Sequence, residues 1–166
     1  MAIGDALLAE FDREMTMTRR MIERVPDARL AWKPHVKSMS LGELATHITN
    51  LPWWGSVVLN QLEFDMEAVP AAVAVGSTAE ALERYDRNVA ESRAALAGKL
   101  DVELMAPWAL KHGGRTIFTM PRGAVWRSFV LNHLIHHRGQ LGVYLRMNDL
   151  PVPGMYGPSA DEAPNT

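Results

Sequence analysis

The chain of 166 residues contains no cysteine. Disulfides, thiolate metal ligands and a cysteine nucleophile are therefore excluded, and any sulfur nucleophile must come from a thiol supplied from outside. No apolar run approaches the roughly 20 residues of a transmembrane helix. The N-terminus also lacks the basic region and the long apolar region of a signal peptide. We therefore expect a cytoplasmic protein that has no membrane partner.

A strong surplus of charge is missing as well. The formal net charge is −2, and the 17 basic and 19 acidic residues are spread along the chain. No basic run stands out, so the sequence lacks the electrostatic footprint of a protein that binds nucleic acid. With 48% hydrophobic and 22% charged residues, the composition is that of an ordinary globular protein. The length predicts one domain over residues 1–166, which is large enough for a single core.

Four long segments repeat apolar residues at the period of an α-helix. They cover residues 4–25, 40–64, 77–98 and 121–147. The second segment begins with Ser40, and Glu43 follows three residues later, which is the pattern of a capping box. The third segment begins in the same way with Ser77 and Glu80. Pro52 lies inside the second segment and should kink or split that helix, because proline removes a helical hydrogen bond.

The remaining segments connect these helices. Residues 101–120 lack a helical pattern, and the stretch from Lys111 to Phe118 holds a Gly-Gly pair between two short candidate strands, which predicts a small β-hairpin before the last helix. The tail at 150–166 is too rich in proline and glycine for a helix, and we expect it to lie extended across the helices. Together these patterns predict an all-α protein, a four-helix bundle with one small β-hairpin excursion.

Three histidines carry the strongest functional signal. His133 and His137 are four residues apart in the last predicted helix, so both imidazoles lie on one face, about one turn apart. His47 lies on the core-facing side of the second predicted helix. Burying neutral imidazoles without partners costs roughly 1–3 kcal/mol for each unsatisfied group, and a shared cation would remove that cost. We therefore predict a transition-metal site, with ordinary hydrogen-bonded core histidines as the alternative.

Other side chains near these histidines are candidates for further roles. Glu43 is one turn before His47 and could accept a hydrogen bond from a ligand or act as a general base, with helix capping as the alternative. Gln140 could hydrogen-bond a metal-bound water, whereas Arg138 points away from this face and could anchor a loop, the tail or a partner. We expect His136 at the edge of the site or in solvent. The aromatic residues that could line a pocket, with core packing as an equal alternative, are Trp53, Trp54, Trp126 and Tyr144.

A second stripe on the last predicted helix lies nearly opposite the histidines. It is apolar and made of small or branched residues, namely Leu131, Ile135, Gly139 and Gly142. Such a stripe usually meets another helix closely. Either a neighbour within the chain or a second subunit could fill it.

Two motifs resemble those of the DinB family. The run HLIHHRGQL from His133 to Leu141, followed by YLR at 144–146 and by PVPGMYGPSADE at 151–162, resembles the family's C-terminal signature. The run SLGELATHI at 40–48 resembles the family's second-helix motif. The likeness covers nearly the whole chain in order and spacing. The second-helix motif alone is unspecific, but the HxxxHRGQ run together with the YGPSADE tail is specific.

The resemblance implies a four-helix bundle with up-down-down-up topology. It also implies a divalent metal, often zinc or nickel, held by three histidines that map onto His47, His133 and His137, with water in an open position. A homodimer formed through helix faces is implied too, and it fits the small apolar stripe. Relatives in the wider DinB and YfiT-like group include enzymes that use low-molecular-weight thiols, such as mycothiol-dependent maleylpyruvate isomerase and bacillithiol or glutathione transferases.

Three functions stay open at this point. In the first, metal-dependent S-transfer, a small thiol binds as the thiolate and attacks an electrophilic small-molecule substrate, because three neutral ligands leave the metal its full 2+ charge. In the second, metal-bound hydroxide hydrolyses a substrate with Glu43 as the base. In the third, the protein is a non-catalytic stress-response or binding module in which the metal holds the second and fourth helices together.

Overall fold

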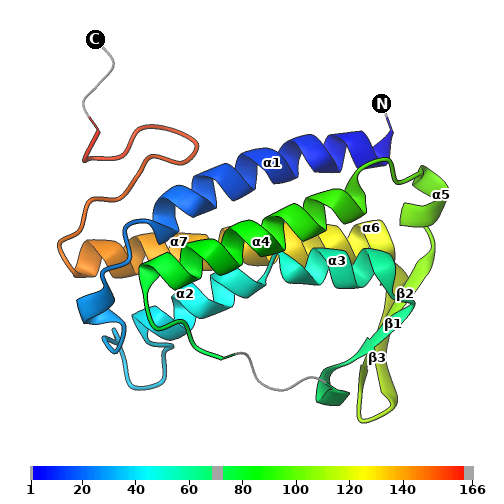
Figure 1. Ribbon diagram of the computed structural model, residues 1–166, viewed down its shortest axis with the longest axis horizontal. Helices are drawn as coiled ribbons and strands as arrows, with labels where there is room; N and C mark the ends of the chain where they lie inside the picture. The colour runs from blue at the N-terminus through cyan, green and yellow to red at the C-terminus, as the bar shows by residue number, and fades with distance from the viewer. Residues whose placement is uncertain (1, 69–72, 163–166) are drawn as a thin grey trace.

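The computed structural model describes residues 2–68 and 73–162, and most of these residues are helical. The long helices are α1 (Ile3–Ile22), α2 (Leu41–Asn50), α3 (Trp53–Asn60), α4 (Thr78–Leu96) and α7 (His133–Met147). The short helical segments are η1 (Asp27–Arg29), η2 (Met66–Ala68), α5 (Asp101–Leu104), α6 (Arg122–Val125) and η3 (Trp126–Asn132). Both α1 and α2 pack against α4 and against α7, so the long helices enclose a common interior (Figure 1). Within the described residues, none of the helices combines the length and the apolarity that crossing a bilayer needs.

The predicted second helix is two helices in the structure. Ser40 caps α2, since its hydroxyl accepts a hydrogen bond from the Glu43 backbone N–H at 3.1 Å and the Glu43 carboxylate accepts one from the Ser40 N–H at 2.6 Å. The predicted capping box is therefore confirmed. Pro52 precedes α3 and splits the segment as predicted. α3 ends at Asn60, earlier than predicted, because the residues that follow turn into a strand.

The third predicted helix is present as α4, with one difference at its start. The Ser77 hydroxyl accepts from the Glu80 backbone N–H at 3.1 Å, but the Glu80 carboxylate accepts from the Gly76 N–H at 2.8 Å instead of from Ser77. The predicted capping box is therefore only half formed. At the other end, α4 stops at Leu96, and Gly98 has a φ of +75°, a left-handed conformation that glycine adopts without strain.

The last predicted helix is one uninterrupted helical segment made of α6, η3 and α7. Its middle part, η3, is a π-helix, in which hydrogen bonds span five residues and the turn is wider than in an α-helix. The sequence predicted an α-helix throughout, and this prediction is wrong for these residues. The short α5 was also missed, because residues 101–120 were expected to lack helix.

A three-stranded sheet lies at one end of the helices, where the sequence predicted only a hairpin (Figure 1). Its strands are β1 (Glu63–Asp65), β2 (Pro107–His112) and β3 (Arg115–Pro121). β2 and β3 form the predicted antiparallel hairpin, and Gly113 and Gly114 at its turn have φ values of +56° and +75°, as tight hairpin turns require. The unpredicted β1 pairs in parallel with β2, and Phe64 lies opposite Leu110. The all-α prediction therefore needs this correction, although the protein is mainly helical.

Residues 150–162 beyond α7 form no helix, as predicted, but they loop back on themselves instead of lying extended, since the Val152 N–H donates to Asp161. Ion pairs attach this tail to two helices. Arg146 of α7 contacts Asp161 at 2.5 Å, and Arg20 of α1 contacts Glu162 at 3.2 Å. The Glu162 carboxylate also accepts a hydrogen bond from the Gly154 N–H at 2.8 Å. These contacts hold the tail against α1 and α7. The last four residues of the predicted tail, 163–166, lie outside the described residues.

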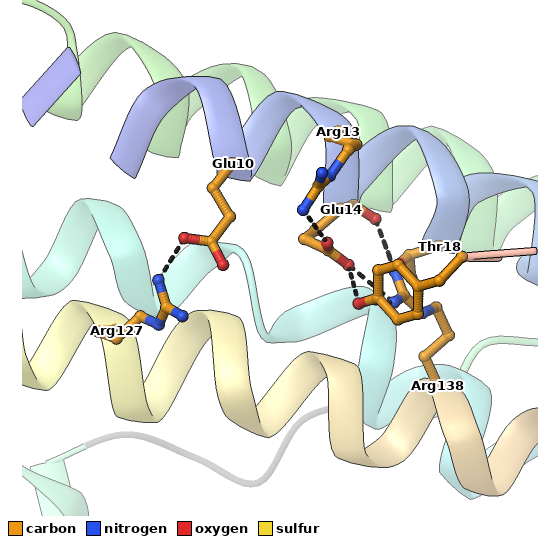
Figure 2. Close-up of polar contacts among 7 residues, drawn as sticks. Glu10, Arg13, Glu14, Thr18, Arg127 and Arg138 are labelled. Carbon is orange, nitrogen blue, oxygen red and sulfur yellow. Dashed lines mark hydrogen bonds and ion pairs between the residues drawn. The ribbon is translucent and has the colours of Figure 1, made fainter. Parts of the chain in front are cut away.

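A buried ion pair joins α1, α7 and the tail. Arg138 lies 2.7 Å from the Glu14 carboxylate, and only 3% and 1% of the two side chains are exposed. Arg138 also donates to the Glu14 backbone oxygen and to the Thr18 hydroxyl (Figure 2). The Tyr156 hydroxyl accepts from Arg138 at 2.7 Å and donates to Glu14 at 2.8 Å. Arg138 therefore points away from the histidines, as the sequence predicted, and anchors the tail, which was one of the three roles left open for it.

Candidate metal centre

Three histidines converge between α2 and α7. One ring nitrogen from each of His47, His133 and His137 lies within 4.8 Å of the other two. The Nε2 atoms of His47 and His133 are 3.1 Å apart. The His137 ring lies 4.4 Å from the His47 ring and 4.7 Å from the His133 ring, measured between centroids. The structure therefore brings together the three residues that the sequence singled out.

The packing of α2 and α7 places these side chains. On α2, Leu44 and Ile48 are buried in the core, and His47 between them is half-buried at the edge of that face. On α7, Leu134 and Leu141 are fully buried and fix the rotation of the helix. A substitution that loosened this packing would move the imidazoles apart, because the ligand set spans two separate helices.

Gln140 orients one of the three rings. Its side-chain oxygen lies 2.7 Å from Nδ1 of His137. An amide oxygen can only accept a hydrogen bond, so Nδ1 of His137 carries the proton and Nε2 keeps its lone pair. Metal-binding histidines are commonly held in this way through their second nitrogen. The sequence suggested that Gln140 would contact a metal-bound water, whereas the structure places it on His137.

Burial favours the neutral form of all three rings. Burial, followed by repulsion from the nearby His137 and His133, lowers the pKa of His47 to about 4. Burial is also the main reason that the pKa values of His133 and His137 lie below the ordinary histidine value. For His137, the hydrogen bond to Gln140 opposes this shift. The neutral imidazole is the form that binds a metal ion, so the lowered pKa values reduce the competition of protons for the cluster.

The cluster fits a tetrahedrally coordinated cation. Two nitrogens that are each about 2.0–2.1 Å from one tetrahedral ion lie roughly 3.3 Å apart, close to the 3.1 Å between His47 and His133. A hydrogen bond between these two rings would have a similar length, but it would not explain why His137 converges on the same point. Within the described part of the chain, the cluster contains no carboxylate. Three neutral ligands with a position left open are the donor set of catalytic zinc sites.

Glu43 does not have the surroundings of a general base. It completes the capping box, and its carboxylate also lies 3.3 Å from the Lys33 ammonium group. The Ser40 backbone hydrogen bond and then Lys33 lower the pKa of Glu43, which makes it a weaker base. The structure therefore shows the capping role, which the sequence analysis gave as the alternative.

The neighbouring histidine His136 is exposed and stands outside the cluster. Its ring lies 4.8 Å from that of His137 between centroids, yet it is not one of the three converging ligands. This is the position at the edge of the site that the sequence predicted. His136 therefore offers a matched comparison for its neighbour in mutational tests.

A cavity of about 820 Å³ opens beside His47. Trp53, Trp54 and Phe64 contribute aromatic surface to its lining, and the rings of Trp54 and Phe64 are 4.7 Å apart between centroids. The prediction that Trp54 lines a pocket is therefore supported by the structure. A cavity of this size is typical of small-molecule sites. Residues of α4 line another part of the cavity, and no feature of the sequence had indicated them.

The other two predicted pocket residues do not line this cavity. Trp126 is fully buried and packs on Phe11, with 5.0 Å between ring centroids. Tyr144 packs edge-on against Trp32, and its hydroxyl donates to the Met39 backbone oxygen at 3.2 Å. Both residues have the core-packing or structural role that the sequence gave as the alternative, because periodicity places a side chain inward without showing whether space remains around it.

This chain is similar in sequence to a known protein family over nearly its whole length. The sequence profile of the DinB family matches residues 2–165. The chain belongs to the DinB family. A stretch of 43 residues is 46% identical to the Bacillus subtilis (strain 168) protein named "Uncharacterized protein YrdA", and it covers 26% of this chain and 25% of that protein. The chain therefore matches about a quarter of the length of this relative.

Two solved structures share the fold of this DinB-family chain. A DinB-like protein from Bacillus cereus ATCC 10987 superposes with a TM-score of 0.69 at 23% identity, over 92% of this chain and 97% of that one. The DinB-like protein YjoA from Bacillus subtilis superposes with a TM-score of 0.65 at 19% identity, over 87% of this chain and 92% of that one. At these identities the similarity shows the fold alone.

Proposed function

We propose that this DinB-family protein is a metal-dependent enzyme that transfers an exogenous thiol to an electrophilic small molecule. The observation that carries the proposal is the convergence of three neutral imidazoles beside a cavity of small-molecule size. A purely structural metal would usually have all four positions filled by protein groups. An adjoining cavity would also serve no purpose in that case.

The residues of the chain have separate roles in this proposal. His47, His133 and His137 hold a divalent transition metal, zinc or nickel, and Gln140 keeps the His137 ring in its binding orientation. When bound, such an ion lowers the pKa of a coordinated thiol and so supplies a thiolate near neutral pH. Because the chain contains no cysteine, the sulfur belongs to a low-molecular-weight cosubstrate.

The reaction class follows from this assignment. The thiolate sulfur forms a bond to the electrophilic carbon, the leaving group departs with its bonding electron pair, and the thiol proton passes to solvent. The cavity beside His47 holds the electrophile and excludes part of the bulk water from it. Hydrolysis is less favoured, because Glu43 is the only base that the sequence offered and it is engaged by Ser40 and Lys33.

The test uses metal-replete protein with a panel of small thiols and a chromogenic aryl halide, after elemental analysis of the purified protein. We expect turnover that depends on a thiol and falls by roughly 100-fold or more in His137→Ala, since changes outside the ligand shell alone cost 10- to 100-fold. His136→Ala is the matched control, because it removes an imidazole from the next position on the same helix but outside the cluster. That variant should keep the activity of the parent protein.

Two outcomes would contradict transfer. Turnover of ester or amide substrates without any thiol would identify a hydrolase. Absence of turnover with every thiol, in protein shown to contain the metal, would leave the third function, a non-catalytic module in which the ion joins α2 and α7.

Several finer expectations belong with this proposal. They are the single domain over 1–166, the up-down-down-up order of a four-helix bundle, the cytoplasmic location and the homodimer. For the homodimer, Leu131 is fully buried. A side chain at Gly142 would meet Met21 at 3.2 Å and Val152 at 3.7 Å within the same chain. Leu131 and Gly142 are thus covered within the chain, whereas Gly139 is exposed and a side chain there would meet nothing within 4 Å, so we propose the dimer contact at this open part of the stripe.

A further inference from the structure

The cavity beside His47 carries positive charge on the side formed by α4. The charged residues of its lining are Arg84, Arg87 and Glu43. Glu43 is the single acid among them, and it is held by the Ser40 N–H and by Lys33. The described part of the lining therefore presents more cationic than anionic groups to whatever occupies the cavity.

The two arginines differ in the contacts that they make within the protein. Arg84 donates to the Val73 backbone oxygen at 2.7 Å and to the Glu80 carboxylate at 2.6 Å. Its guanidinium is therefore already engaged by groups of the protein. Arg87 has a loose contact with Glu83 at 4.0 Å, and 56% and 81% of these two side chains are exposed. Exposed ion pairs of this kind contribute little to the stability of the folded protein. The Arg87 guanidinium is therefore available to a ligand, and its planar fork matches a carboxylate.

The aromatic part of the cavity lining offers a ligand a different kind of contact from that of Arg87. Trp53, Trp54 and Phe64 form a cluster in which each ring is tilted against its neighbours, with centroids 4.7–5.9 Å apart. Trp53 and Trp54 remain partly accessible. Partly exposed indole rings beside a cavity offer flat apolar surface on which another ring can stack or pack edge-on. One cavity therefore combines an aromatic wall with a cationic group.

We propose that this cavity binds an aromatic organic anion. Arg87 contacts its carboxylate or other anionic group, and Trp53, Trp54 and Phe64 contact its ring. The inference rests on the proposed function in one respect, because such a molecule would be the electrophile that the thiol attacks beside His47. Arg87 is a specificity-determining residue in this arrangement, and the binding itself does not require the metal.

The test is calorimetric titration of the full-length protein, first in the presence of a chelator, with phenylbutyrate, phenylbutyramide and butyrate as probes. We expect phenylbutyrate to bind at least about 10-fold more tightly than the uncharged amide, as a charge-assisted hydrogen bond provides, and butyrate to bind more weakly than phenylbutyrate. Arg87→Gln should remove the advantage of the acid and leave the affinity for the amide unchanged. Arg24→Gln is the matched control, because Arg24 is an exposed arginine outside the cavity lining.

The outcomes separate this inference from the proposed function. Equal affinities for the acid and the amide, no binding of either at millimolar concentration, or an acid preference that survives in Arg87→Gln would overturn the inference. Butyrate binding as tightly as phenylbutyrate would overturn the role of the aromatic wall. If the acid preference depends on Arg87 but no thiol transfer occurs, the cavity assignment stands and the proposed function fails. If transfer occurs and Arg87→Gln alters neither binding nor KM, only the inference fails.

Discussion

Glu14 and Arg138 form the most deeply buried ion pair among the described residues (Figure 2). This pair connects α1 to α7, and Tyr156 of the tail hydrogen-bonds to both residues. Glu14→Gln removes one charge and leaves the Arg138 guanidinium buried without its counter-ion. We expect a loss of roughly 3–5 kcal/mol in the free energy of unfolding, the usual result of breaking a buried pair from one side. Chemical denaturation of the two proteins measures this loss.

Glu10 provides the control for this prediction. It pairs with Arg127 one turn earlier on the same helix (Figure 2), but 23% and 48% of these side chains are exposed. Glu10→Gln should therefore change the free energy of unfolding by less than about 1 kcal/mol. Equal effects of the two substitutions would show that burial of the Glu14–Arg138 pair has no energetic consequence.

At the level of single residues, the sequence could predict a functional role for side chains whose spacing along a helix places them together. His133 and His137 could be assigned to one face because four residues make about one helical turn. Arg87 could not be recognised, because an arginine on a helix normally lies on a solvated face. For Trp126 the sequence left a pocket and core packing as equal alternatives, since an inward direction is common to core and cavity residues, and the structure shows the core packing. What distinguishes these cases is the empty space around a side chain, which only the packed structure reveals.

Among the elements, capping and breaking signals were informative, while features that depend on distant contacts were not. The capping box at Ser40 and the break at Pro52 depend only on neighbouring residues, so both could be predicted from the sequence. β1 has only three residues and exists because it pairs in parallel with β2, far along the chain. The π-helix η3 has a weak local signal, since the Ser128 hydroxyl donates to the Ala124 backbone oxygen at 2.8 Å and such side-chain bonds compete with regular helical ones.

The tail is an element whose attachment should depend on pH. Its Asp161 has a pKa lowered from 3.8 to about 2, first by the hydrogen bond from Arg146 and then by that from the Val152 N–H. A carboxyl whose pKa is lowered by folding stabilises the protein above its unfolded pKa and loses this effect as the pH falls through the folded pKa. Asp161→Asn should therefore lower the urea midpoint at pH 7, and the difference from the parent protein should shrink between about pH 4 and pH 2.

Asp149 supplies the comparison for the tail. It is an exposed carboxylate just after α7, close in the chain to the tail, and no hydrogen bond or ion pair of its side chain occurs among the described residues. Asp149→Asn should leave the pH dependence of the urea midpoint unchanged. A pH-independent effect of Asp161→Asn would mean that the tail is held by shape and not by this charge.

For the whole molecule, the cluster joins two helices that lie far apart in the chain. His47 is 86 residues from His133, so the site exists only in the folded protein and a bound ion stabilises that state selectively. At a free metal concentration 100 times the dissociation constant, this linkage contributes about 2.7 kcal/mol. For a domain of this size, we expect Tm to rise by roughly 5–10 °C when zinc or nickel is added to chelator-treated protein.

The same thermal measurement decides whether α2 and α7 both contribute to that ion. His47→Ala removes the ligand of α2 and should abolish most of the rise in Tm, even though both histidines of α7 remain. His136→Ala should retain the full rise, because the exposed imidazole lies outside the cluster. A rise that persists in His47→Ala would place the ion on α7 alone, where it could not hold the helices together. Since no thiol or substrate is present, the result reports the metal centre separately from any activity.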